Sequence, residues 1–291
     1  MSAWDFQDRL VVIATMHRKE EAIAPLLQAA LGVKTWVPTD FDTDQFGTFT
    51  RDVKRPADQR ATARLKIDHA LANTGATLGI ASEGSFAPHP ALPMVPLNRE
   101  LVMLRDLDTD LELIGEAAST DTNFDHATIQ SLEAAWEFAQ KALFPSHGLV
   151  VMPSAEATQP LEQATFQSLI FKGIVDPAEL EDRVSWMLAT FGQAHLETDM
   201  RAMMNPTRMG AIAQATADLL RKFQQRCPQC GFPGFDQVAY HRGLPCSLCG
   251  MPTQLPLVAI AQCQACGHTH ETLHPHGSST ANPAQCPFCN P

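Results

Sequence analysis

The chain has 291 residues, with 21 Lys or Arg against 32 Asp or Glu and a formal net charge of −11. Neutralisation of phosphates by Lys and Arg supplies most nucleic-acid affinity, so this balance makes nucleic acid an unlikely partner. No apolar run approaches a membrane span, and the first residues lack a signal-peptide pattern. We therefore expect a cytoplasmic protein, without a membrane anchor, that is long enough for one large core plus an accessory module.

The first part of the chain alternates predicted strands and helices. The apolar run from Leu10 to Ala14 is bounded by charges and predicts a buried strand. Ile23, Leu26 and Leu27 begin a helical stripe that ends at Gly32. The predicted elements are strands at 8–16, 33–37 and 76–82, helices around 23–32 and 56–73, and a loop or short hairpin at 39–55. This alternation is typical of α/β proteins.

The pattern then changes to paired strands. Apolar residues at 100–107 and 111–118 flank a turn-like segment at 108–110 and predict an antiparallel hairpin. Helices near 128–143 and 177–191 and a strand near 148–152 follow. The last helix has Asn205 as its expected N-cap and Pro206 at its first position, and its apolar stripe runs to Phe223.

All eight cysteines lie in the last 65 residues, as four CxxC pairs. Two such pairs can surround one tetrahedral cation, so four pairs predict two structural zinc ions in a double zinc ribbon. The ligands are Cys227, Cys230, Cys246, Cys249, Cys263, Cys266, Cys286 and Cys289. Gaps of 15 and 19 residues favour sequential ligation, with the first two pairs on one ion and the last two on the other. Interleaved ligation stays open, because the middle gap of 13 residues is also long enough.

Other uses of the cysteines are less favoured. Disulfides would need an oxidising compartment, and thioredoxin-like chemistry uses one CxxC at a helix start. Five histidines lie among the pairs and could replace a thiolate, but eight thiolates already satisfy two ions; they are His241, His268, His270, His274 and His276. The ribbon has too few basic residues to bind nucleic acid, so its expected role is protein contact or bracing of the main domain.

Candidate chemistry lies where strands end. Thr15, His17 and Lys19 form the junction of the first strand and helix, where free backbone N–H groups favour an anion. Glu83 leaves the third strand beside a glycine and could hold Mg²⁺ or orient water, with Arg64 and Lys66 on the preceding helix supplying positive charge. Each of these patterns is also compatible with an ordinary turn that carries solvated charges.

In chain order, these motifs resemble those of the inosine-triphosphate pyrophosphatase (Maf-like) superfamily. Thr15 and His17 stand at the Thr and Asn places of its Thr/Ser-x-Asn-x-x-Lys loop, with Lys19 one residue early. The segment 62–67, Thr-Ala-Arg-Leu-Lys-Ile, resembles its Asn-Ala-x-x-Lys-Ala helix motif, and the segment 81–84 its acidic turn. Pro206-Thr207-Arg208 stands where Ser-His-Arg opens the final helix. The whole chain also resembles an uncharacterised bacterial family that joins such a domain to a double zinc ribbon.

The resemblance implies an α/β domain over 1–225, with a mixed twisted sheet flanked by helices and a cleft between two lobes, followed by the ribbon at 226–291. It implies a nucleoside-triphosphate pyrophosphohydrolase that uses Mg²⁺ or Mn²⁺. Glu83 and Lys66 would be catalytic, and Thr15, His17, Lys19, Arg64 and Arg208 would bind the nucleotide. One of Asp40, Asp42 or Asp44 could complete the metal shell. The alternative is a non-enzymatic nucleotide- or protein-binding adaptor that uses the ribbon for protein contacts.

Arg208 is unusual for its position. It falls in the first turn of the last predicted helix, where the helix dipole disfavours a cation by roughly 0.3–1 kcal/mol. A local conflict of this kind is a hint of function, and the resemblance places an arginine of the nucleotide site here. The alternative is an ion pair with Glu197 or Asp199.

Overall fold

The computed structural model describes residues 4–39, 58–154 and 162–291. Compact contacts divide the chain into two units, one over Asp5–Leu219 and one that joins Leu220–Pro291 to Trp4. We call them the α/β unit and the ribbon unit. The aspartates 40, 42 and 44 lie outside the described residues. In the part of the chain that the structure describes, no helix combines the length and apolarity needed to cross a bilayer.

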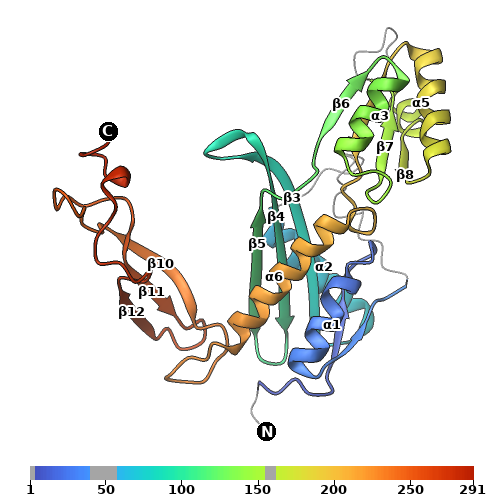
Figure 1. Cartoon of the computed structure of the whole chain (residues 1–291). Coiled ribbons are helices and arrows are strands. Elements are labelled where there is room, and N and C mark those ends of the chain that lie inside the picture. Colours follow the sequence, from blue (N-terminus) through green and yellow to red (C-terminus); the bar gives the residue numbers. More distant parts are fainter. Residues whose placement is uncertain (1–3, 40–57, 155–161) are drawn as a thin grey trace. The chain divides into compact units, whose positions relative to one another are not determined.

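The first sheet of the α/β unit is mixed, as predicted, with the strand order β2-β1-β3-β4-β5. Its strands are β1 (Leu10–Ile13), β2 (Lys34–Trp36), β3 (Leu78–His89), β4 (Leu92–Asp106) and β5 (Leu111–Ser119). β1 pairs in parallel with β2 and β3, while β3, β4 and β5 form an antiparallel meander (Figure 1). The predicted hairpin at 100–107 and 111–118 is therefore confirmed.

The third strand is longer than the sequence predicted. β3 continues past Ser82 to His89, and β4 begins at Leu92, so the proline-rich segment forms the end of a hairpin with Pro88 opposite Pro96. β1 pairs with β3 only as far as Ile80. Among the described residues, the rest of β3 has β4 on one side only, and such one-sided strands tolerate prolines that cannot donate to a second neighbour.

Three helices pack on this sheet. They are α1 (Glu20–Leu31), α2 (Gln59–Thr74) and α6 (Pro206–Gln224). Ala63, Ile67 and Leu71 of α2 share a core with β1, β3 and β4. On the opposite face, α6 runs across the sheet (Figure 1), and Gly115 of β5 lets it approach so closely that a Cβ there would overlap the α6 backbone.

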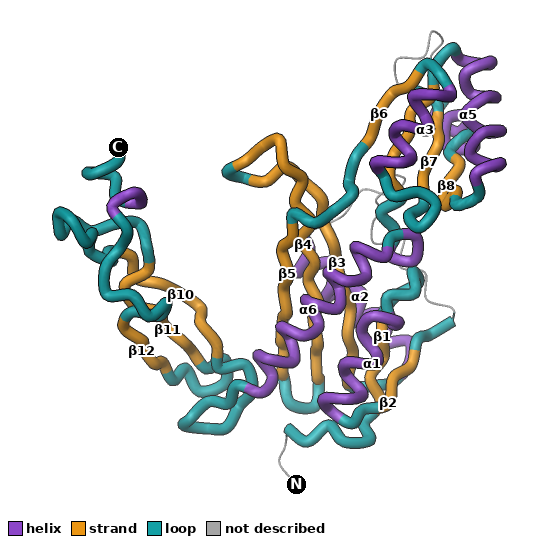
Figure 2. Tube along the Cα trace, viewed as in Figure 1, coloured by secondary structure: helices purple, strands orange, loops and turns teal. Residues whose placement is uncertain are grey.

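A second sheet has the order β6-β9-β7-β8. Its strands are β6 (His126–Ile129), β7 (Leu149–Met152), β8 (Phe171–Ile174) and β9 (Ala194–Thr198). Beside it lie α3 (Leu132–Lys141) and α5 (Pro177–Phe191), which supply much of its core (Figure 2), and the short α4 (Gln163–Ser168) precedes β8 in the chain. The predicted helix near 128–143 begins only at Leu132, because Ser131 caps it and the preceding residues pair as β6.

The start of α6 agrees with the prediction. Asn205 Oδ1 accepts a hydrogen bond from the backbone N–H of Arg208 at 2.9 Å, so Asn205 caps the helix that Pro206 opens. The apolar stripe includes Ile212, Leu219 and Phe223, all of them buried. The interruption at Thr216 is also buried, and its hydroxyl donates to the carbonyl of Ile212.

The ribbon unit contains an antiparallel meander of β10 (Asp236–Arg242), β11 (Pro256–Gln262) and β12 (Thr269–Leu273). Most residues of β10 and all of β12 are exposed, so this sheet has little apolar core of its own. The four CxxC turns lie before, between and after these strands. Such a module depends on metal for its folding free energy.

Candidate functional site

Lys19 occupies the open side of β3, just beyond the end of β1. Its ammonium donates to the carbonyl oxygen of Ser82 at 2.8 Å, and the side chain is buried. The junction after β1 thus places a cation where the next pairing strand would otherwise lie.

Two buried ion pairs lie near Lys19, one on each face of the sheet. Glu83 points toward α2, where its Oε1 lies 2.6 Å from Lys66 Nζ. Glu100 of β4 lies opposite Gly84 in the register and points toward α6, where its Oε1 lies 2.8 Å from Arg208 Nε. Successive residues of a strand face opposite sides of the sheet. The Glu83–Lys66 pair therefore lies on the face toward α2, and the Glu100–Arg208 pair, level with Gly84, lies on the face toward α6.

Gly84 makes room for the pair on the α6 side. A Cβ at this position would overlap the Glu100 carboxylate and would lie 2.5 Å from Arg208 Nη2. Arg208 also donates to the carbonyl oxygen of Met200, so its guanidinium is held from two directions. The structure pairs Arg208 with Glu100 and Asp199 with Arg201, so the ion pair that it shows for Arg208 is with a residue that the sequence analysis did not consider.

We call these five side chains the β3 cluster: Lys19, Lys66, Glu83, Glu100 and Arg208. Each is at most 7 % exposed. The cluster holds three basic groups and two carboxylates, and a buried excess charge is costly. Burial, followed by the positive charge of Arg208, lowers the pKa of Lys19 to about 7. The cluster is therefore close to neutral without a ligand and gains a positive charge when Lys19 takes up a proton.

An anion that binds beside Lys19 would have a pH-dependent affinity. A bound anion favours the charged ammonium, so the pKa of Lys19 rises in the complex and binding takes up a proton. Affinity should level off as the pH falls below the pKa of about 7, because Lys19 then becomes protonated, and should fall as the pH rises above it. For the nucleoside triphosphate that the sequence resemblance implies as ligand, the Kd should rise about tenfold between pH 7.5 and 9, and calorimetry in buffers of different ionisation enthalpy measures both the Kd and the proton uptake. An undiminished proton uptake in Lys19→Met would show that another group titrates.

The remaining predicted residues lie in different surroundings. Thr15 is buried at the end of β1, and its Oγ1 accepts a hydrogen bond from the backbone N–H of His17. His17 is partly exposed in the same turn. Arg64 faces away from the β3 cluster and forms an exposed bidentate pair with Glu112 of β5. The structure thus brings Lys19, Lys66, Glu83 and Arg208 together and separates Arg64 from them.

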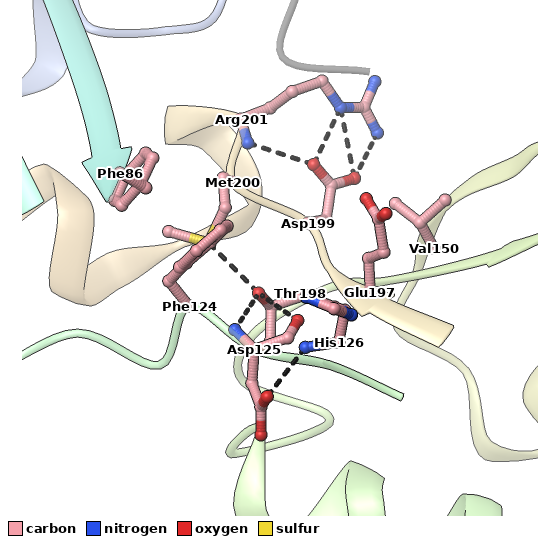
Figure 3. A pocket seen from close by; sticks show the side chains of 10 residues that line it. All are labelled: Phe86, Phe124, Asp125, His126, Val150, Glu197, Thr198, Asp199, Met200 and Arg201. Atoms are coloured by element: carbon pink, nitrogen blue, oxygen red, sulfur yellow. Dashed lines mark hydrogen bonds and ion pairs between the residues drawn. The ribbon is translucent and has the colours of Figure 1, made fainter. Parts of the chain in front are cut away.

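A cavity of about 230 Å³ lies beside the cluster, between the first and second sheets of the α/β unit. Its wall includes Phe86 from β3 and Phe124, whose rings stack with centroids 5.4 Å apart. The other lining residues are Asp125, His126, Val150, Glu197, Thr198, Asp199, Met200 and Arg201 (Figure 3). Arg208 is next to both the cavity and the β3 cluster. It is a member of the cluster, and its guanidinium lies 5.5 Å from the ring centroid of Phe86 in the cavity wall.

Sequence reasoning missed Glu100 and the aromatic residues of this cavity. A signal for Glu100 was present, because a lone acid just ahead of the apolar run 101–104 must find a partner if the strand is buried. Phe86 and Phe124 gave no comparable signal, since aromatic residues are common in cores and turns alike.

The eight cysteines form two sets of four. One set is Cys227, Cys230, Cys263 and Cys266, and the other is Cys246, Cys249, Cys286 and Cys289. The Sγ–Sγ distances between paired turns are 3.6–3.8 Å. Four sulfurs bound to one zinc ion at about 2.3 Å lie about 3.8 Å apart, so both sets fit tetrahedral zinc. Among the described residues no histidine joins either set.

The predicted sequential grouping of the cysteines is therefore wrong, and the two sets are interleaved along the chain. The reason is the meander: β10 spans seven residues, about 23 Å, and carries the chain from the first CxxC turn to the other end of the sheet. β11 runs antiparallel to β10 and returns the third turn to the first. The second and fourth turns meet at the opposite end in the same way.

Together these features define an α/β protein with a C-terminal ribbon that can hold two zinc ions. The family model of a domain of unknown function, DUF6671, matches residues 66–291, so the chain belongs to this family. The match begins at Lys66 within α2 and covers Glu83, Glu100, Arg208 and every cysteine. No curated protein matches the chain.

Proposed function

We propose that the α/β unit binds a nucleoside triphosphate and hydrolyses it to a nucleoside monophosphate and pyrophosphate. The observation that carries the proposal is the β3 cluster, which buries three basic side chains and two carboxylates beside a strand-to-helix turn. Buried ionisable groups whose environment perturbs their titration are frequent at functional sites. The element order and motifs also follow the pyrophosphatase resemblance.

In this proposal the phosphates lie beside Lys19 and Lys66 at the turn that contains Thr15. Glu83 accepts a proton from the water that attacks the α-phosphorus, and the bond from that phosphorus to the bridging oxygen breaks. The ammonium of Lys66 is 2.6 Å from Glu83 Oε1, and it can then neutralise charge that develops on the phosphates.

Magnesium or manganese would enter with the triphosphate. Within the described residues, the only groups of three or more His, Cys, Asp or Glu side chains close enough to share a metal are the two cysteine sets. The described part of the cluster therefore does not form a Mg²⁺ site from protein groups alone, and phosphate oxygens would have to complete the coordination.

Glu83→Gln tests the assignment. The amide keeps a carbonyl that can accept from Lys66 but cannot take the proton of water, so we expect turnover to fall at least 100-fold. Nucleotide affinity should be unchanged or tighter, because a negative charge near the phosphates is lost. Pyrophosphate release and calorimetric binding measure the two effects. Glu112→Gln, in the exposed pair with Arg64, is the matched control. Full turnover in Glu83→Gln would make Glu83 a structural residue.

A second candidate function, protein contact through the ribbon, is favoured by one asymmetry. In the cysteine set that contains Cys246 and Cys286, the CxxC turns carry Leu248 and Phe288, whose exposed fractions are 74 % and 61 %. The equivalent positions of the first set hold Gln229 and Ala265. If a panel of nucleotides with Mg²⁺ or Mn²⁺ gives neither turnover nor binding, an adaptor role replaces hydrolysis as the better account.

A further inference from the structure

The cavity beside the β3 cluster is suited to one small heterocycle. Its volume of about 230 Å³ lies below the roughly 300–1,000 Å³ of pockets that enclose drug-sized ligands. Phe86 and Phe124 supply an apolar wall with ring planes inclined by 23°. Opposite them in Figure 3 stand charged side chains from β9 and the segment after it. A flat ring with polar edges is the ligand class that uses both walls.

Carboxylates predominate in the described part of the polar wall. They belong to Asp125, Glu197 and Asp199, and the described lining holds one guanidinium, that of Arg201. Arg201 pairs with Asp199: its Nε and Nη2 donate hydrogen bonds to the Asp199 carboxylate at 3.0 and 2.6 Å. Glu197 Oε1 lies 3.3 Å from His195 Nε2. Carboxylates accept hydrogen bonds and do not donate them.

We infer that this cavity selects nucleotides whose base presents an amino group, such as adenine or cytosine, over the corresponding oxo bases. The inference rests on the proposed nucleotide function. An exocyclic amino group donates to a carboxylate and forms a strong, charge-assisted hydrogen bond. An oxo group at the same place has no hydrogen to donate. It and the carboxylate are then two acceptors that repel each other. Glu197 is the specificity-determining side chain, because it lies on β9 in the wall that faces the aromatic pair.

The placement is consistent with one molecule that reaches both sites. Arg208 lies against Phe86 and pairs with Glu100, so the cavity wall and the β3 cluster share a residue. A nucleotide with its base in the cavity lies on the α6 face, so its phosphates would reach Lys19 around the open side of β3, and Lys66 lies beyond it on the α2 face.

The test compares two pairs of nucleotides that differ at one exocyclic group: adenosine with inosine triphosphate, and cytidine with uridine triphosphate, each as a non-hydrolysable α,β-methylene analogue. Calorimetry on the full chain should give a Kd at least tenfold lower for the amino member of each pair. In Glu197→Gln the side-chain amide can donate to an oxo group, so the ratio should fall below about threefold. Glu133→Gln, an exposed acid in the first turn of α3, is the matched control and should keep the ratio.

The outcomes separate the two proposals. Binding of both members with equal affinity, or a preference for the oxo bases, overturns the inference and leaves the nucleotide function standing. An unchanged ratio in Glu197→Gln removes Glu197 from the specificity site, and Asp125→Asn then tests a second carboxylate of the wall in the same way. If no nucleotide binds to the wild-type protein, both proposals fail.

Discussion

A strong zinc chelator will unfold the ribbon unit and leave the α/β unit folded. The exposed strands β10 and β12 bury too little apolar surface to hold the meander without metal. Structural zinc supplies about 10–16 kcal/mol of apparent binding free energy per site, and here that energy is folding free energy. The α/β unit has its own core and should not respond. Hydrogen exchange should lose protection across the ribbon strands alone, and metal analysis should give two zinc ions per untreated chain.

Double substitutions will show which cysteines share an ion. Cys230→Ser with Cys263→Ser damages only the first set and should leave one tightly bound zinc. Cys230→Ser with Cys249→Ser damages both sets and should leave none that resists a competing chelator. Sequential ligation would give the opposite result for each pair. Retention of two ions by either variant would exclude both arrangements.

Arg208→Met will be among the most destabilising substitutions in the α/β unit. Both members of the Arg208–Glu100 pair have side chains with 0 % exposure. Removal of one partner leaves an uncompensated buried charge, which costs about 3–5 kcal/mol. The long apolar side chain of methionine keeps most of the volume, so a packing defect contributes little. Urea unfolding of the variant, compared with wild type at equal protein concentration, measures the loss.

Two further variants separate this charge effect from other causes. Arg208→Met combined with Glu100→Leu removes both charges and should recover most of the stability, because apolar replacements of a complete buried pair are often neutral. Arg64→Met breaks the exposed pair with Glu112 and should cost no more than about 1 kcal/mol. Equal losses for Arg208→Met and for the double variant would assign the effect to packing rather than to charge.

Local signals were sufficient for most of the single elements. The apolar run at Leu10–Ile13 forms β1, and the cap at Asn205 with Pro206 starts α6, because these features act within a few residues. The ligand identities also follow from sequence, since a CxxC turn already places two thiolates on one side of a tight bend.

Features that join distant segments were less predictable. The CxxC spacing was compatible with sequential and with interleaved zinc ligation, and only the antiparallel pairing of β10 with β11 selects between them. The length of β3 likewise depended on the partner that β4 supplies through Pro96. A strand pairing joins residues whose separation along the chain carries no local preference, so register is decided by the tertiary fold.

The candidate site shows the same division. Sequence alone singled out Lys19, Glu83 and Lys66 by their places near strand ends and on the helix before the third strand, and Arg208 because a cation in the first turn of a helix conflicts with local preference. It could not show that Glu83 and Arg208 serve opposite faces of one sheet, nor that Glu100 is the partner of Arg208. Those facts come from strand alternation at Gly84 and from the helices that cover each face. The sequence determined which residues carry charge into the core, and the tertiary structure decided which of them meet, because burial requires each charge to find a partner wherever the fold provides one.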